Sequence, residues 1–490
     1  MGSVRIDFDR PSLMRVIKQI RPSVWEIPKT FRPYMRVPAR IYMTPQMLEK
    51  TELGAIQQLL NVASLPGIVK YSIMMPDGHW GYGFPVGGVA AFDLEEGIIS
   101  PGGVGYDINC GVRFLVTNLT VKDVEPRVRE LLRAIEGYIA AGVGRGGRVK
   151  LSRGQLDELL ENGAVWAVEN GYGYKEDLRH IEDYGRIEGA DASKVSNRAK
   201  QRGHDQVGSL GSGNHYAEVE VVTKICDEKI AKQFGIHEEG QIGVMIHTGS
   251  RGLGHQVASD YIDVMMRAVR KYNLRLRDRQ LACAPFQSRE AQDYLAAMRA
   301  AANFAFANRQ ILTHWMREAF REVFGDDVEL RLLYDVAHNI AKVEKHKVDG
   351  EMREVVVHRK GATRGFPAGR PELPEDYRDI GQPILVGGSM REGSYVLLGT
   401  ETSLEEVFGS TVHGAGRTLS RKAAKRRFRD EQIQRLLQRE GIYVSAASRG
   451  EIAEEAPDAY KSLEQVVEAA VQAGIAKRIF KTKPIIVRKG

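Results

Sequence analysis

The chain has 490 residues, a formal net charge of +7 and a pI of about 9.1. Its 43% hydrophobic and 27% charged residues are typical of an ordinary globular protein with a sizeable core. Three distant cysteines exclude a disulfide framework, and no stretch reaches the ~18 apolar residues of a membrane span. The sequence therefore predicts a cytoplasmic protein, whose basic charge suits an anionic partner such as a nucleic acid or nucleotide.

Short elements are predicted along the first 120 residues. Residues 1–48 mix charge, proline and short apolar runs, which indicates an N-terminal arm with edge elements. Thr44 followed by Pro45 predicts the start of a helix that reaches Asn61. Glycine clusters then separate short β-rich runs. Strands are expected at 68–74, 87–92 and 112–117.

Helices and glycine loops alternate in the middle of the chain. A flexible basic loop at 142–147, which contains Arg145 and is followed by Arg148, comes after the first of these helices. The expected helices span 123–140, 153–170, 192–202, a stretch from about 259, and 288–324. The expected strands span 216–222, 241–246 and 328–334.

The last third of the chain again alternates predicted strands, helices and glycine loops. Asp349-Gly350 predicts a hairpin turn between strands at 342–348 and 353–358. Further strands are expected at 382–386, at 394–398 and at the C-terminus, with helices at 418–440 and 460–473. Strand-to-glycine-loop junctions recur without an internal repeat or a clean linker. We therefore predict one large α+β domain over residues 1–490, in which helices surround mixed β-sheets and strand-end loops converge on one cleft.

The loop from Pro101 to Arg113 crowds four glycines around Asp107 and Cys110. Glycine permits a tight loop, and the two side chains offer a hard oxygen and a soft sulfur to the same ion. The alternative is a buried cysteine beside an aspartate that caps a turn, which the loop alone favours.

Three histidines share one setting: His215, His247 and His338 each lie at a predicted strand end beside glycine or a small polar residue. Each alone is more often a structural histidine than a ligand. Together with Asp107 and Cys110, however, they suffice for a two-metal site with a shared thiolate. Ligand softness alone favours zinc, with manganese second.

Glycine-rich loops at 211–214, 387–390 and 414–416 can direct backbone N–H groups at phosphate oxygens, although none matches a P-loop or dinucleotide fingerprint. Cations in glycine-flanked loops can reach the same anions or can be solvated surface charges. These cations are Arg251, Lys360, Arg364 and Arg417.

His413 is embedded in His-Gly-Ala-Gly-Arg, just before a run at 417–429 with seven basic residues and no acidic one. A neutral imidazole there can attack a phosphorus that metals make electrophilic. A fourth metal ligand or a general base is the alternative. The basic run indicates either a contact to RNA backbone or a solvated helix face.

Six ordered motifs resemble the RtcB family of tRNA-splicing RNA ligases. The similarity runs from about Pro76 to the terminal Lys489-Gly490 and is carried by Asp107-Ile108-Asn109-Cys110-Gly111, Gly211-Ser212-Gly213-Asn214-His215, His247-Thr248-Gly249-Ser250-Arg251-Gly252, Asp335-Val336-Ala337-His338-Asn339, Arg359-Lys360-Gly361-Ala362-Thr363 and His413-Gly414-Ala415-Gly416-Arg417.

The resemblance implies a ligase that depends on GTP and two Mn²⁺ ions. It would join an RNA 2′,3′-cyclic phosphate or 3′-phosphate to a 5′-hydroxyl, in tRNA splicing or RNA repair. His413 would carry GMP covalently before GMP passes to the RNA 3′-phosphate. By similarity, one ion would be held by Asp107, Cys110 and His215, and the other by Cys110, His247 and His338. Where softness alone favours zinc, the resemblance favours manganese.

The resemblance also implies nucleotide and RNA contacts. Glu218 would suit the guanine edge, since a carboxylate accepts from both N1–H and N2–H₂. The implied nucleotide-binding residues are Asn214, His215, Tyr216, Ala217, Glu218, His338, Asn339, Gly387, Gly388, Ser389, Met390, Ser394, His413, Gly414, Ala415, Gly416 and Lys489. The implied RNA- or phosphate-binding residues are Arg251, Lys360, Arg417 and Arg421. An archease-type activating protein is a further implied partner.

Two other functions compete with ligation. The same ions could activate water in a metal-dependent RNA phosphodiesterase or nuclease. A non-catalytic RNA-binding protein could rely on the basic run alone. Neither needs a covalent histidine, so His413 discriminates among the three. The group that would activate the 5′-hydroxyl is not assigned, and Asp77 and His79 are only guesses for it.

Overall fold

A computed structural model describes residues 4–490, so residues 1–3 of the predicted N-terminal arm lie outside the described part. Its helices are α1 (Arg10–Val16), α2 (Pro45–Lys50), α3 (Leu53–Val62), α4 (Val121–Val124), α5 (Val128–Tyr138), α6 (Arg153–Asn162), α7 (Ala164–Glu169), α8 (Asn197–Gly203), α9 (Glu228–Gln233), α10 (Arg251–Lys271), α11 (Arg289–Phe324), α12 (Glu401–Val407), α13 (Arg421–Arg427), α14 (Asp430–Arg439), α15 (Glu451–Glu454) and α16 (Leu463–Gln472).

The strands are β1 (Lys18–Arg21), β2 (Val24–Ile27), β3 (Ala39–Tyr42), β4 (Ile68–His79), β5 (Val86–Asp93), β6 (Ile98–Ile99), β7 (Gly111–Thr120), β8 (Tyr216–Ile225), β9 (Gln241–Thr248), β10 (Ala284–Pro285), β11 (Leu330–Ala337), β12 (Asn339–Val348), β13 (Glu351–Lys360), β14 (Ala362–Arg364), β15 (Pro383–Gly387), β16 (Ser394–Leu398), β17 (Ser410–Val412), β18 (Tyr443–Ala446) and β19 (Lys477–Lys489).

Two large sheets organise these elements. The first has the order β1-β2-β3-β4-β5-β13-β12, and the second has the order β11-β7-β9-β8-β19-β16-β15 with β18 beside β19. Most neighbours are antiparallel, whereas β3 pairs with β4 and β18 with β19 in parallel. This confirms the predicted α+β class with mixed sheets.

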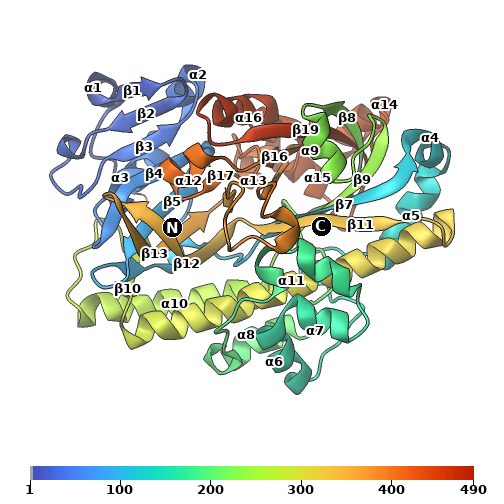
Figure 1. Cartoon of the computed structure of the whole chain (residues 1–490), viewed down its shortest axis with the longest axis horizontal. Coiled ribbons are helices and arrows are strands. Elements are labelled where there is room, and N and C mark those ends of the chain that lie inside the picture. The colour runs from blue at the N-terminus through green and yellow to red at the C-terminus, as the bar shows by residue number, and fades with distance from the viewer. Residues whose placement is uncertain (1–3) are drawn as a thin grey trace.

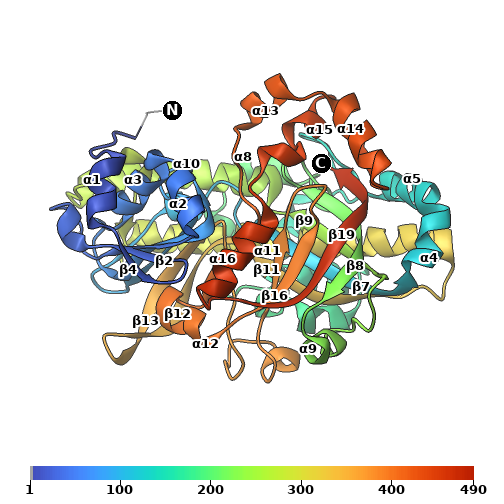
Figure 2. The same cartoon turned by 90° about the horizontal axis from the view of Figure 1, so that it is seen from above.

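Long helices support the two sheets. Figure 1 shows α11 extending beneath both sheets, with α6, α7 and α8 on its other side. In Figure 2, α13, α14 and α15 project together from the upper edge of the molecule, beside β19 and the C-terminus. No helix within residues 4–490 has a segment that is both long and apolar enough to cross a bilayer.

Several predicted boundaries are confirmed for local reasons. Thr44 caps α2, because its hydroxyl accepts from the backbone N–H of Met47, and Pro45 occupies the first turn. The β12–β13 hairpin turns at Asp349-Gly350, where both residues have positive φ, as a tight hairpin turn requires. The long alanine-rich helix also lies where it is predicted, as α11.

Other predicted helices are interrupted. The helix expected at 44–61 breaks at Thr51, which is extended, and the one expected at 153–170 breaks at Gly163, whose φ is +59°. Breaks also divide the helices expected at 123–140, where Pro126 lies, and at 192–202 and 418–440. The helix expected from about Ser259 instead begins at Arg251, so the predicted glycine loop is already helical there.

A buried ion cluster joins α11 to the strands. The Asp335 carboxylate accepts from Arg113 Nε at 2.7 Å and from Arg309 Nη2 at 2.9 Å, and all three side chains are fully buried. Arg309 also donates to the carbonyl oxygens of Asn109 and Thr248, each next to a candidate metal ligand. Asn308 bonds the backbone of Gly208 and Ser209. One helix therefore positions several loops.

This cluster generates a stability prediction. Asp335→Asn leaves two buried guanidinium groups without their counter-charge, so we expect unfolding free energy to fall by about 3–5 kcal/mol. Guanidinium-induced unfolding measures the change. The control is Arg127→Met, which breaks the exposed Arg127–Glu130 pair and should leave the midpoint unchanged. Equal midpoints for Asp335→Asn and the unsubstituted protein would contradict the importance of the cluster.

Candidate active site

One cavity of about 350 Å³ collects residues from both sheets and from the C-terminal loops. Its lining is contributed by the loop before β7, the ends of β8 and β9, the β11–β12 junction, and loops after β15 and β17. Residues far apart in the sequence therefore share one chamber.

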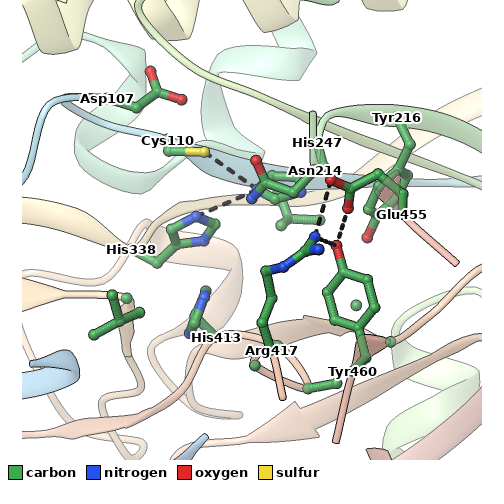
Figure 3. Close-up of a pocket in the computed structure, with 18 of the residues that line it drawn as sticks. Asp107, Cys110, Asn214, Tyr216, His247, His338, His413, Arg417, Glu455 and Tyr460 are labelled. Atoms are coloured by element: carbon green, nitrogen blue, oxygen red, sulfur yellow. Dashed lines mark hydrogen bonds and ion pairs between the residues drawn. The ribbon is translucent and has the colours of Figure 1, made fainter. Parts of the chain in front are cut away.

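Four candidate metal ligands, Asp107, Cys110, His247 and His338, line this chamber (Figure 3), and the fifth, His215, lies beside Asp107 and Cys110. Cys110 Sγ lies 3.2 Å from His247 Nε2 and 3.5 Å from His215 Nε2. His215 Nε2 is 2.8 Å from an Asp107 oxygen, and His247 Nε2 is 3.3 Å from His338 Nε2. Two groups result, Asp107–Cys110–His215 and Cys110–His247–His338, and the ligand atoms within each group lie within 4.8 Å of one another.

The electrostatics of these groups suit a cation. Burial, and next the Asp107 carboxylate, raise the pKa of the Cys110 thiol well above its usual value, so a thiolate there needs a positive partner. Burial, followed by neighbouring imidazoles, holds the pKa values of His247 and His338 well below the usual value. Both rings are therefore neutral, which is the form that binds metal. The donor set fits two ions that share the sulfur.

His413 lies beside this cluster and is held by Asp77. The rings of His338 and His413 are 4.8 Å apart between centroids. Asp77 Oδ2 lies 2.5 Å from His413 Nδ1 and also accepts from the backbone N–H groups of His413 and Gly414. Burial alone would raise the pKa of the Asp77 carboxyl, but the charge and hydrogen bonds of His413 lower it overall.

An ionised Asp77 fixes the tautomer of His413. Because the carboxylate only accepts hydrogen bonds, Nδ1 carries the proton that it shares with Asp77. Nε2 then keeps its lone pair and is the free nitrogen of the ring. The arrangement can therefore present a neutral imidazole nitrogen as a nucleophile or a ligand.

The other end of the cavity is built by a second set of contacts. Arg417 donates to a Glu455 oxygen at 3.0 Å and to the Tyr460 hydroxyl at 3.2 Å, and Tyr460 also bonds Glu455 (Figure 3). Burial, and next Glu220, raise the pKa of Glu218 well above its usual value, whereas Lys489 opposes that shift. This end therefore offers an aromatic ring, carboxyl groups and an ammonium.

Most residues expected to bind nucleotide reach this cavity. The lining includes Asn214, Tyr216, Glu218, His338, Asn339, Gly387, Gly388, Ser389, Met390, His413, Gly414, Ala415, Gly416 and Lys489. Among residues 4–490, the lining does not include His215, Ala217 or Ser394. Ala217 belongs to a hydrophobic cluster, and the Ser394 hydroxyl donates to Glu220. A nucleotide contact by His215, Ala217 or Ser394 therefore stays a prediction.

The expected cations differ in their surroundings. Arg417, Arg421 and Lys360 line the cavity. Burial lowers the pKa of Lys360 to about 7, and its ammonium donates to the carbonyl oxygens of Tyr82, Phe84 and Gly102. Arg251 instead bonds Ser209 and the carbonyl oxygen of Gly142. Arg364 is fully buried against Glu182 and Asp183, so it is a structural cation.

Several residues that line or support the cavity are absent from the predicted site, and Asp77, Glu455 and Tyr460 make the most contacts among them. Asp77, only a guess beforehand, contacts a histidine 336 positions away. Tyr460 and Glu455 line the end of the cavity opposite the candidate metal ligands, yet they lie in a segment with no glycine loop or histidine. Only the Pro76-Asp77-Gly78-His79 loop had a visible signal, which was its glycine-flanked aspartate.

Comparison with known proteins gives one family. The family described as tRNA-splicing ligase RtcB matches residues 58–490. A tRNA-splicing ligase RtcB of Thermococcus kodakarensis is 57% identical over 478 residues, which cover 97% of this chain and 99% of that protein. Proteins of the same name from Archaeoglobus fulgidus and Pyrobaculum aerophilum are 54% and 53% identical, each with 97% and 99% coverage. This chain therefore belongs to the RtcB family.

Proposed function

We propose that this protein is a GTP- and Mn²⁺-dependent RNA ligase that acts in tRNA splicing, RNA repair or both. It would join RNA 2′,3′-cyclic phosphate or 3′-phosphate ends to 5′-hydroxyl ends. The observation that carries the proposal is the position of His413, whose ring is oriented by Asp77 and lies against two overlapping metal-ligand groups. Membership of the tRNA-splicing ligase RtcB family supports the same conclusion.

The residues of the cavity suggest the following sequence of bond-forming and bond-breaking steps. His413 Nε2 attacks the α-phosphorus of GTP, so an N–P bond forms and pyrophosphate leaves. An oxygen of the RNA 3′-phosphate then displaces the histidine and takes GMP as a phosphoanhydride. The RNA 5′-hydroxyl next attacks the 3′-phosphorus, loses its proton and releases GMP. A cyclic end must first be opened by water.

Each part of the cavity has a task in this scheme. Two Mn²⁺ ions, held by Asp107, Cys110 and His215 and by Cys110, His247 and His338, would neutralise charge on the phosphates. Asp77 keeps the proton on Nδ1, so Nε2 remains available for every turnover. The backbone at 387–390 and 414–416 would hold phosphates. Glu218, Tyr460 and Lys489 would receive the guanine base.

The shared sulfur generates a metal-binding prediction. Cys110→Ser should weaken Mn²⁺ binding at both positions by about 100-fold, because serine is a poor anionic ligand. His247→Ala should affect mainly one ion. Equilibrium dialysis with metal analysis measures both.

The exposed Cys226 provides the control, since Cys226→Ser should retain full metal content. Two ions bound with unchanged affinity to Cys110→Ser would contradict the shared thiolate. Loss of only one ion from Cys110→Ser would show that Cys110 binds one ion and does not bridge two.

The nucleophile generates the decisive test. Incubation with α-labelled GTP and Mn²⁺ should leave acid-labile, base-stable label on the protein, and His413→Ala should abolish it. Asp77→Asn should slow labelling more than tenfold, since the ring loses its charged partner. His237→Ala, at an exposed histidine, is the matched control.

The same experiment separates the competing functions. Cleavage of RNA without any protein-bound label would favour a metal-dependent phosphodiesterase and refute the ligase. RNA binding with neither label nor cleavage would favour a non-catalytic binding protein.

The basic face of α13 generates a third prediction. Arg421 and Lys425 pair with Glu454, whereas the exposed Lys422, Arg426 and Arg427 form no ion pair within residues 4–490. Replacing these three by glutamine should weaken RNA binding and reduce the slope of log K against log salt by about 0.7 for each lost phosphate contact. Fluorescence anisotropy at several salt concentrations measures the slope.

The control removes as many charges elsewhere. Lys345, Lys347 and Arg353 are exposed on the β12–β13 hairpin, which lies away from α13 in Figure 2. Their replacement should leave the slope unchanged. Equal slopes for both triple variants would show that α13 is a solvated helix without a specific contact to RNA.

A further inference from the structure

Three aromatic rings form a row that meets the cavity at Tyr106. The Tyr106 and His255 rings are stacked, with centroids 4.8 Å apart and an interplanar angle of 25°. Tyr82 meets Tyr106 edge to face, with centroids 5.4 Å apart. His255 is exposed, and Tyr82 and Tyr106 are half-buried. We call these three residues the aromatic row.

The row continues directly from the candidate metal site. Tyr106 precedes Asp107 in the chain and lines the same cavity. His255 lies on the second turn of α10, and Ser250, just before that helix, donates its backbone N–H to Asp107. A polymer with one end at Asp107 and Cys110 would therefore leave the cavity over these rings.

Charge differs along the row. Near His255, the exposed Arg202 bonds Gln256, and Arg251 is four residues away on the same helix. Near Tyr82, the carboxylates of Asp263 and Asp278 join burial and Tyr106 in raising the pKa of the phenol to about 12. A polyanion would follow the basic end at His255, so Tyr82 serves to support Tyr106.

Fold stability does not account for the exposed ring of the row. His255 is on the exposed side of α10, whose buried face consists of other residues, among them Leu253, Val257 and Ala258. It places one face on Tyr106 while the residue stays open to solvent. Stacked rings next to cations are the arrangement that receives unpaired nucleobases.

We propose that Tyr106 and His255 form a stacking platform for a base at the RNA end whose terminal group reaches the candidate metal site. The inference rests on the proposed function, because it takes RNA as the substrate. Tyr82 positions Tyr106, and Arg202 and Arg251 attract the adjoining phosphates. The platform tolerates any base, since every base has a π face.

The test compares the binding of RNA that has its terminal nucleobases with the binding of RNA that lacks them. Labelled single-stranded RNA ending in a 3′-phosphate is titrated with protein and Mn²⁺ in the absence of GTP. His255→Ala and Tyr106→Leu should each raise Kd by about five- to tenfold, whereas Tyr106→Phe should match the unsubstituted protein. RNA with abasic residues at its last two positions should bind more weakly and should no longer distinguish the variants.

Controls decide what the result means. His204→Ala removes another exposed histidine, outside the row, and should leave Kd unchanged. A parallel titration with 5′-hydroxyl RNA, abasic at its first two positions, identifies which strand uses the platform. Equal Kd values for all variants on both strands, or an equal loss on intact and abasic RNA, would overturn the proposal.

Labelling of the unsubstituted protein by GTP is measured in the same preparation and needs no RNA. Absence of label refutes the ligase whatever the titrations give. Label together with base-independent binding refutes the platform alone.

Discussion

The buried contact between Arg309 and Asp335 is the constraint on which the site depends. Arg309 lies midway along α11, and its guanidinium bonds the carboxylate that precedes His338 by three residues. The same group donates to the carbonyl oxygens beside Cys110 and His247. Because a guanidinium is planar and rigid, one side chain sets the relative positions of three loops.

That rigidity matters because the chemistry requires several unfavourable groups to coexist. Two neutral imidazoles, those of His247 and His338, the buried Cys110 thiol and the half-buried Asp107 carboxylate crowd within a few ångströms of one another. Burial disfavours the thiolate, and a cation offsets that cost only if the ligands cannot separate. Asn308 adds to the restraint by bonding the backbone at Ser209 and Gly249. The scaffold thus holds donor atoms that would otherwise spread apart into solvent.

Local chemistry explains which features could be predicted from the sequence. Thr44-Pro45, Asp349-Gly350 and the alanine-rich α11 follow capping, turn and helix preferences that act over a few residues. The helix beginning at Arg251 escaped prediction because glycines at 249, 252 and 254 mimic a loop. The sequence alone could not assign a role to Asp77, because only the folded chain brings it to His413. Tyr460 and Glu455 carry no local signal.

The two ends of the cavity are built from different structural elements, and this difference suits the proposed order of steps. The metal end stands on strand ends that α11 ties together. The opposite end depends on Arg417, which links Glu455 and Tyr460 across loops beside α13 and α15. In the proposed ligase, a nucleotide would enter and leave once per turnover, whereas the ions would stay. We infer that the strand ends tied together by α11 would hold the ions, whereas the loops beside α13 and α15 would admit and release the nucleotide.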